Sequence, residues 1–286
     1  MASQRDIRRR IGAVRNIKQI TRAMQFVAAS KLKRAQDATL ASRPYSEKID
    51  EVIADLAVVL SDEDHPLFTK REGGKRLIVF ITTDRGLAGP LNTNAIRFAL
   101  REIVDHNETG VDLSLVTVGR KGRDAIRRAR LPIEAHFSGF GDRPTFGDVT
   151  ALARLVTDDF LAGTYGRVDI IYTRFVSTLT QRPTMDHLLP MEPHDDTAGI
   201  PGNQFLFEPS PAAVLQQLLP RYIATRIYQA VLENTASEWS SKMIAMKNAT
   251  ESAEELIDDL TLSYNKVRQA NITREMIEIA SGASAR

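Results

Sequence analysis

The sequence predicts an α/β protein in which the N- and C-terminal helices form a long antiparallel coiled coil beside a central, mostly parallel α/β domain. The first observation is where the helix-breaking residues lie. All twelve prolines lie between Pro44 and Pro220, and the flanking stretches contain one glycine each, Gly12 and Gly282. Because proline breaks a helix interior and glycine weakens it, both ends can form uninterrupted helices. At about 1.5 Å per residue, the C-terminal stretch could reach roughly 100 Å. The second observation is an alternation of strand and helix patterns in between.

The N-terminal helix is predicted by apolar residues that recur at steps of three or four, which form one stripe on a helix. The stripe consists of Ile7, Ile11, Val14, Ile17, Ile20, Met24 and Val27. Ser3 followed by Asp6 resembles a capping box at its start. The pattern resumes after Pro44, so this proline either kinks the helix or ends it.

The middle of the chain alternates between short apolar runs and helical periodicity. The predicted strands are Leu77 to Thr82, Leu113 to Val118, Ile133 to Phe137 and Val168 to Val176. The predicted helices are Asn92 to His106, Arg120 to Arg130 and Phe146 to Leu161. This order implies a mostly parallel, Rossmann-like sheet covered by helices. We expect loops at 61–66 and 191–202, and a short last strand at Phe205 to Phe207.

The C-terminal helix is predicted to begin near Pro211, and Pro220 is a place where it could bend. Its stripe continues through Met243, Met246, Ala249, Ala253, Leu256, Leu260, Tyr264 and Val267. A mean step near 3.5 favours supercoiling against another helix. The first helix is the nearest partner, and an intermolecular coiled coil is the alternative. Small residues at Ala28, Ala29, Ala249 and Ala253 would let the two backbones approach closely. The predicted division is 1–60, 61–208 and 209–286.

Composition excludes several classes of protein. The chain has no cysteine, so it can form neither a disulfide nor a thiol site. No apolar run approaches the roughly 20 residues that span a bilayer, and the basic N-terminus lacks a secretory signal. The net charge of +2 is unevenly distributed, because residues 1–43 carry eleven Lys and Arg and two acidic residues. A basic first helix indicates either a polyanionic partner or a solvated or protein-facing stripe.

Two loops are candidates for anion binding, since each follows a predicted strand and precedes a helix. They are Asp84 to Gly89 and Gly119 to Gly122. Neither has a nucleotide-binding glycine motif, so a tight turn is the favoured interpretation of the first loop and an exposed basic turn that of the second. The five histidines show no metal-ligand spacing, and the acidic cluster Glu254, Glu255, Asp258 and Asp259 is typical of a solvated helix face. We therefore predict no catalytic residue, cofactor or metal.

Several segments together resemble the gamma subunit of F-type ATP synthases, in the same order and over nearly the whole chain. The strongest is Lys242 to Ala285, with Ile272, Thr273, Glu275, Glu278, Gly282 and Ala283 at its core. The others are Ile17 to Gln36, Asp84 to Leu87, Arg174 to Thr184 and Phe205 to Pro209. Ala88 stands where many members have Cys, and Pro90 where many have Gly. The cysteine-bearing insertion of the chloroplast type is absent, so thiol control is not expected.

The resemblance implies a non-catalytic rotor shaft of a proton-translocating enzyme, held peripherally at the cytoplasmic face of a bacterial plasma membrane. Its implied partners are the alpha and beta subunits, the epsilon subunit and the membrane c-ring, without nucleic acid or direct membrane insertion. Contacts to the alpha/beta ring are expected at Met24, Lys242, Arg268, Gln269, Thr273, Ile277 and Ile279. Contacts at the epsilon and c-ring end are expected at Phe205, Phe207 and Glu208.

Two other hypotheses remain at this point. One is a coiled-coil adaptor that holds partners together without turning. The other is a nucleotide-dependent enzyme that uses the loop from Asp84 to Gly89, which direct nucleotide binding to the chain would reveal.

Overall fold

The structure is a computed structural model that describes residues 3–59, 75–107, 112–191, 208 and 210–284. The expected loop at 61–66, nearly all of the one at 191–202 and the expected strand at 205–207 lie outside the described residues. The chain divides into two compact units, which we describe separately. The first is Met1–Ala29 with Lys242–Arg286, and the second is Ser30–Ser241. Both of these boundaries fall inside helices, so the functional division at 60 and 208 stays a prediction.

Two long helices, α1 (Gln4–Val59) and α5 (Pro211–Ser284), form the ends of the chain. Pro44 and Pro220 both lie within them, so neither proline ends its helix. The predicted capping box is present at the start of α1. The backbone N–H of Asp6 donates to Ser3 Oγ at 3.2 Å, and the backbone N–H of Ser3 donates to Asp6 Oδ2 at 3.3 Å. These bonds satisfy donors that a helix start otherwise leaves unpaired.

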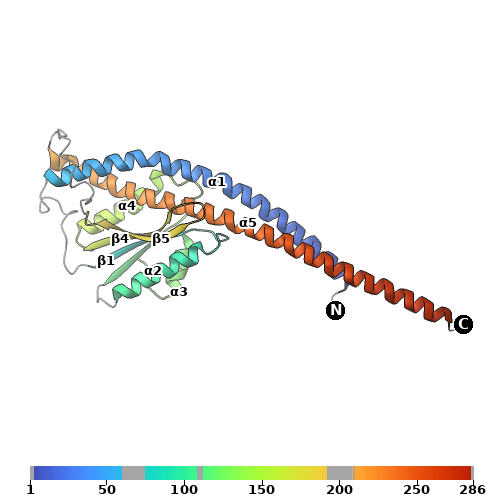
Figure 1. Cartoon of the computed structure of the whole chain (residues 1–286). Helices are drawn as coiled ribbons and strands as arrows, with labels where there is room; N and C mark the ends of the chain where they lie inside the picture. The colour runs from blue at the N-terminus through green and yellow to red at the C-terminus, as the bar shows by residue number, and fades with distance from the viewer. Residues whose placement is uncertain (1–2, 60–74, 108–111, 192–207, 209, 285–286) are drawn as a thin grey trace. The chain divides into compact units, whose positions relative to one another are not determined.

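The second unit contains a five-stranded sheet in the order β3-β2-β1-β4-β5 (Figure 1). Its strands are β1 (Arg76–Ile81), β2 (Leu113–Val118), β3 (Ala135–Phe137), β4 (Arg167–Phe175) and β5 (Gln181–Leu189). The pairs β1–β2, β1–β4 and β2–β3 are parallel, and β4–β5 is antiparallel. The prediction of a mostly parallel sheet is confirmed. The order matches the first five strands of a doubly wound fold.

Helices cover both faces of this sheet (Figure 1). One face packs against α2 (Leu91–Asn107) and α3 (Arg120–Arg128). The other packs against α4 (Phe146–Leu161) and the parts of α1 and α5 that belong to this unit. Leu77, Val79 and Ile81 of β1 enter the second core, whereas Ile78 and Phe80 enter the first. Burial on both faces explains why β1 reads as a continuous apolar run.

The antiparallel strand β5 was not predicted. Its sequence, QRPTMDHLL, contains a proline and charged residues and has no apolar alternation. Such a sequence is tolerated because β5 ends the sheet order and therefore has a sheet neighbour on one side only. Its His187 also joins a buried polar cluster around Asp169 of β4. Asp169 Oδ1 lies 3.0 Å from His187 Nδ1, and its Oδ2 accepts from Arg76 Nε and Arg167 Nε.

This cluster makes a prediction about stability. Burial raises the pKa of Asp169, but hydrogen bonds from His187 and Arg167 and the charge of Arg76 outweigh it, so the pKa is lowered. Because the pKa of Asp169 is lower in the folded state than in the unfolded state, its charge stabilises the fold at pH values above the ordinary aspartate pKa of about 3.9. That stability is lost as the pH falls through the folded-state pKa. Asp169→Asn should lower the free energy of unfolding by about 3–5 kcal/mol at pH 7, because it leaves Arg76 buried and uncompensated.

Urea unfolding of both proteins at neutral and acidic pH checks this expectation. The difference in the free energy of unfolding between wild type and variant should shrink as the pH falls below the ordinary pKa of aspartate. An equal difference at both pH values would show that the Asp169 charge is not what stabilises the sheet.

Candidate functional site

Within the first unit, α1 pairs with α5 in antiparallel orientation. Gln4 Nε2 donates to Tyr264 Oη at 3.0 Å, and Lys18 Nζ lies 2.7 Å from Glu254 Oε1. The hydroxyl groups of Thr21 and Thr250 are 2.8 Å apart. Residue numbers thus rise along α1 while those of its contacts fall along α5. The predicted pairing of the chain's own two ends is confirmed, and no second copy is needed to cover the seam.

The seam of α1 differs from the predicted stripe. Buried or half-buried positions recur every seven residues, at Ile7, Val14, Thr21 and Ala28. Three residues expected in the seam are exposed instead, namely Ile17, Ile20 and Val27. Leu256 of α5 is also exposed. Steps of three or four residues fit both the seam, whose period is 3.5, and a second apolar face beside it. Spacing alone therefore cannot tell which apolar residues of α1 lie in the seam.

The last part of α5 extends beyond its pairing with α1. The helix continues about 30 Å past Tyr264, which contacts Gln4 at the start of α1, and ends at Ser284. On this extension Ile272, Met276 and Ile279 are all exposed, and their spacing of four and three residues places them on one face. Ile279 is 73% exposed. We refer to Ile272, Met276 and Ile279 as the apolar tip face.

Most of the predicted contacts to a surrounding ring are free to meet a partner. Arg268, Gln269, Thr273, Ile277 and Ile279 are exposed on the extension. Sequence reasoning did not single out Ile272 and Met276 as contacts, although their spacing from Ile279 was the available signal.

The remaining predicted contacts differ in exposure. Met24 is half-buried, and Lys242 is buried, with less free surface for a partner than the residues of the extension. Glu208 is exposed, and Phe205 and Phe207 lie outside the described residues.

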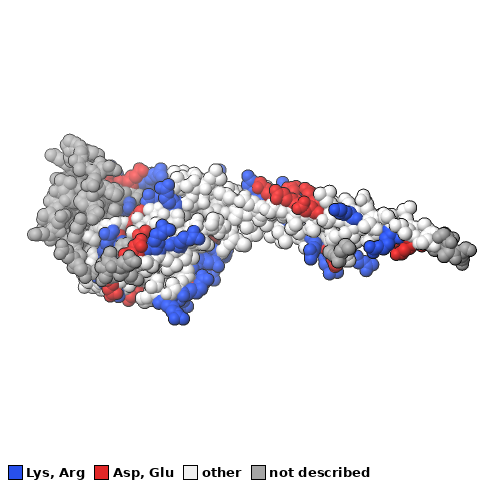
Figure 2. Space-filling view, turned by 60° about the horizontal axis from the view of Figure 1, so that its bottom comes forward, with Lys and Arg blue, Asp and Glu red and all other residues white. Residues whose placement is uncertain are grey.

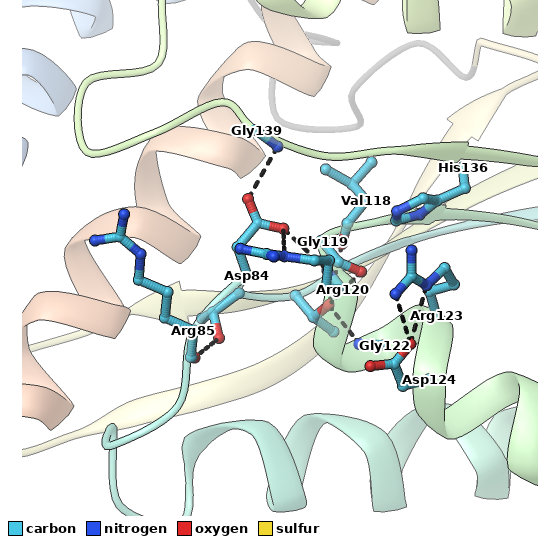
Figure 3. A network of polar contacts seen from close by, with 12 residues as sticks. Asp84, Arg85, Val118, Gly119, Arg120, Gly122, Arg123, Asp124, His136 and Gly139 are labelled. Carbon is cyan, nitrogen blue, oxygen red and sulfur yellow. Dashed lines mark hydrogen bonds and ion pairs between the residues drawn. The ribbon is translucent and has the colours of Figure 1, made fainter.

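The two candidate anion loops meet at one edge of the sheet, in the second unit (Figure 3). Asp84 follows β1, and its carboxylate occupies the place at the start of α3 where an anion would bind. Asp84 Oδ1 accepts from the backbone N–H of Arg120 at 3.0 Å, and Oδ2 accepts from the backbone N–H of Gly139 at 2.9 Å. Arg120 Nε lies 3.7 Å from the same carboxylate.

The next donors of α3 are also satisfied from within the chain. The backbone N–H of Lys121 donates to the Thr83 carbonyl at 3.1 Å, and that of Gly122 donates to Thr82 Oγ1 at 2.8 Å. Gly122 is required here, because an added Cβ would lie 2.7 Å from Thr82 Oγ1. A cavity of about 220 Å³ beside these loops is lined partly by Asp84, Arg85 and Glu238. The helix start therefore offers a phosphate few unsatisfied donors.

Among the described residues, no group of His, Asp or Glu could hold a metal ion. Glu254, Glu255, Asp258 and Asp259 are all exposed, and Glu254 pairs with Lys18. Within the same part of the chain, no helix combines the length and apolar character that a membrane crossing needs.

Comparison with known proteins shows the family. A family model described as ATP synthase matches residues 3–285. An ATP synthase gamma chain of Dehalococcoides mccartyi is 47% identical, over 100% of this chain and 99% of that protein. Those of Roseiflexus castenholzii and Pelotomaculum thermopropionicum are 46% and 44% identical, with the same coverage.

The chain belongs to the ATP synthase gamma chain family.

Solved structures show the same fold. A chain from the central stalk and c-ring of the Tetrahymena thermophila mitochondrial ATP synthase matches with a TM-score of 0.60 at 26% identity. That match covers 80% of this chain and 99% of the other. A chain of the Euglena gracilis mitochondrial ATP synthase matches with a TM-score of 0.71 at 22% identity, over 99% of this chain and 94% of that one. The gamma chain architecture of a mostly parallel sheet with long terminal helices is thus shared.

The sheet-edge network predicts how a variant would respond to anions. Asp84→Ala removes the internal carboxylate and leaves the N–H groups of Arg120 and Gly139 without their acceptor. We expect a loss of about 1–3 kcal/mol in the free energy of unfolding, partly restored by sulfate. Thermal unfolding with and without sulfate measures this. The control is Asp112→Ala, which removes an exposed carboxylate from a 3.9 Å surface ion pair with Lys75. An equal response of both variants to sulfate would contradict the assigned role of Asp84.

The helix pairing predicts a difference between two leucines of α5. Leu260 is half-buried on the seam, whereas Leu262 is 70% exposed. Leu260→Asp should weaken the pairing by about 1–3 kcal/mol, because it places a charge in the seam, and Leu262→Asp should not. The readout is the rate of disulfide formation between Gln4→Cys and Tyr264→Cys, in a chain with no other cysteine. Equal rates in both aspartate variants would refute the seam assignment.

Proposed function

We propose that this gamma chain is the non-catalytic central-stalk rotor subunit of a proton-translocating F-type ATP synthase. It transmits torque between the membrane c-ring and the catalytic ring of alpha and beta subunits. The observation that carries this proposal is the apolar tip face, on a helix that has passed the start of α1. Exposing Ile272, Met276 and Ile279 on one side of a helix end is unfavourable in water. The same apolar face is favourable on a shaft tip that other subunits enclose.

The shaft acts through unequal contacts. A helix pair with one helix longer than the other presents different surfaces to ring subunits that are otherwise equivalent. A contact shifts a subunit between open and closed states only if it differs in free energy between those states. Shifting such an element from 1:99 to 99:1 takes about 5.5 kcal/mol, so several contacts must act together. The contacts we propose are Arg268, Gln269, Thr273, Ile277, Ile279, Met24 and Lys242, of which Lys242 has the least exposed surface.

The absence of catalysis in this chain is supported by the loops at the sheet edge. The start of α3, where a nucleotide phosphate would bind, already holds the carboxylate of Asp84. In this proposal the beta subunits catalyse ATP synthesis. The α/β unit would contact epsilon and the c-ring, with Glu208, Phe205 and Phe207 at that end. The complex would lie peripherally at the cytoplasmic face of a bacterial plasma membrane.

A cross-link tests rotation against a static adaptor role. In a complex assembled with its partner subunits, Ile279→Cys is linked by a disulfide to a cysteine on the surrounding ring. We expect proton-driven ATP synthesis to fall in proportion to the cross-linked fraction and to recover on reduction. The control joins Gln4→Cys to Tyr264→Cys within the shaft, which should leave synthesis intact. Normal synthesis with the ring cross-link in place would favour the adaptor.

A further inference from the structure

The outer side of the α2 and α3 layer is strongly basic. Apart from Arg120, which lies beside Asp84, the exposed cations on α2, on α3 and just after α3 form what we call the α2–α3 basic face, namely Arg97, Arg101, Lys121, Arg127, Arg128 and Arg130. The buried side of the same layer packs on the sheet through Ala95, Ala99, Ile103 and Ile126. Five of these cations lie on the two helices, which therefore turn them away from the core, and Arg130 is exposed just after α3.

Little negative charge balances this face. The exposed acids on the two helices are Asp105 and Asp124, and Arg123 already binds Asp124 with Nη2 at 2.8 Å from Oδ1. Among the described residues, Arg97, Arg101 and Arg127 take part in no ion pair. In Figure 2, which brings the underside of Figure 1 forward, Lys and Arg atoms gather along the lower right margin of the α/β body. Six like charges on one surface repel each other and favour an anionic partner.

We propose that the α2–α3 basic face docks on the anionic headgroups of the membrane surface. This inference rests on the proposed function for its location, since that function places the chain beside a membrane. The partner chemistry comes from the face itself. Each basic side chain held near an anionic bilayer contributes roughly a fivefold gain in affinity, and the attraction fades within about 10 Å in moderate salt.

The layout of the cations favours a planar partner over an acidic peptide. Five of them lie on two neighbouring helices of 17 and nine residues and Arg130 lies two residues after α3, and none of the six lines the cavity at the sheet edge. A lipid surface presents negative charge over a wide area, which matches cations spread along two helices. Five of the six are arginines, whose guanidinium groups bind phosphate oxygens through two parallel hydrogen bonds.

Vesicle binding by the full-length chain tests the proposal. The vesicles contain phosphatidylcholine mixed with phosphatidylglycerol, or phosphatidylcholine alone, and binding is followed by co-sedimentation. We expect binding only to the mixed vesicles, and weaker binding as salt is raised. Lys121→Gln combined with Arg127→Gln should weaken it about 25-fold. Arg8→Gln combined with Arg15→Gln, two exposed arginines of α1, is the charge-matched control and should weaken it less than about threefold.

A fluorescent label locates the contact independently of the charge changes. The cysteine-free chain permits single labels at Ala129→Cys, just after α3, and at Ala13→Cys on α1, both at exposed positions. An environment-sensitive dye at 129 should shift its emission on anionic vesicles, and a dye at 13 should not.

Three outcomes would overturn the proposal. The first is a shift only at position 13, and the second is an equal loss of binding in both glutamine variants. The third is tighter binding to poly-glutamate than to the vesicles with the same sensitivity to Lys121 and Arg127, which would identify an acidic protein surface as the partner. A chain that binds vesicles through this face yet does not assemble with ring subunits would contradict the proposed function and leave the docking face standing.

Discussion

The antiparallel pairing of α1 with α5 is the interaction on which the rest of the first unit depends. Its polar layer contributes little free energy, because an exposed pair such as Lys18 and Glu254 is typically worth less than about 1 kcal/mol. That pair and the Thr21–Thr250 contact instead select one register of the two helices. If either helix shifted along the other, hydroxyl and ammonium groups would face apolar residues. The register in turn decides where α1 begins relative to α5. With Gln4 opposite Tyr264, the remainder of α5 has no partner helix in the described chain, and the apolar tip face is exposed as a consequence.

In the second unit, a fold that commonly binds nucleotides has its ligand position occupied from within. Asp84 does electrostatically what a phosphate would do, accepting hydrogen bonds at the positive end of α3. The same carboxylate joins three segments that are distant in sequence, because Arg120 and Gly139 follow β2 and β3. An internal anion is always present, so the sheet edge is held together without any dependence on ligand concentration. That suits a body that transmits force rather than one that responds to a metabolite.

Much of this architecture could be predicted from local patterns, because each pattern has a direct physical cause. Terminal stretches without proline and with one glycine each predicted the long helices, which also continue through Pro44 and Pro220, and the apolar run of β1 reflects burial on both faces. Strand β5 could not be predicted, since an edge strand needs no apolar alternation and His187 is held there by Asp169, 18 residues away along the chain. The role of Asp84 as an internal hydrogen-bond acceptor could not be predicted from the sequence either. Its two donors follow other strands, and only the parallel packing of β1, β2 and β3 brings them together.

The misplaced stripe of α1 has a cause that also bears on function. Ile17, Ile20 and Val27 were assigned to the seam because their spacing suits a helix face, yet they lie outside it and are exposed. α5 shows the same superposition, since Leu256 is exposed beside a seam that buries Met246 and Ala253. A helix that needs only one partner carries one apolar stripe, and charged residues occupy the rest of its surface. Two overlapping stripes on both helices are what a two-helix shaft requires if it must hold itself together and also meet a surrounding sleeve. The apolar pattern in the sequence contains both stripes together. The seven-residue repeat of buried positions in the structure identifies which residues belong to the seam.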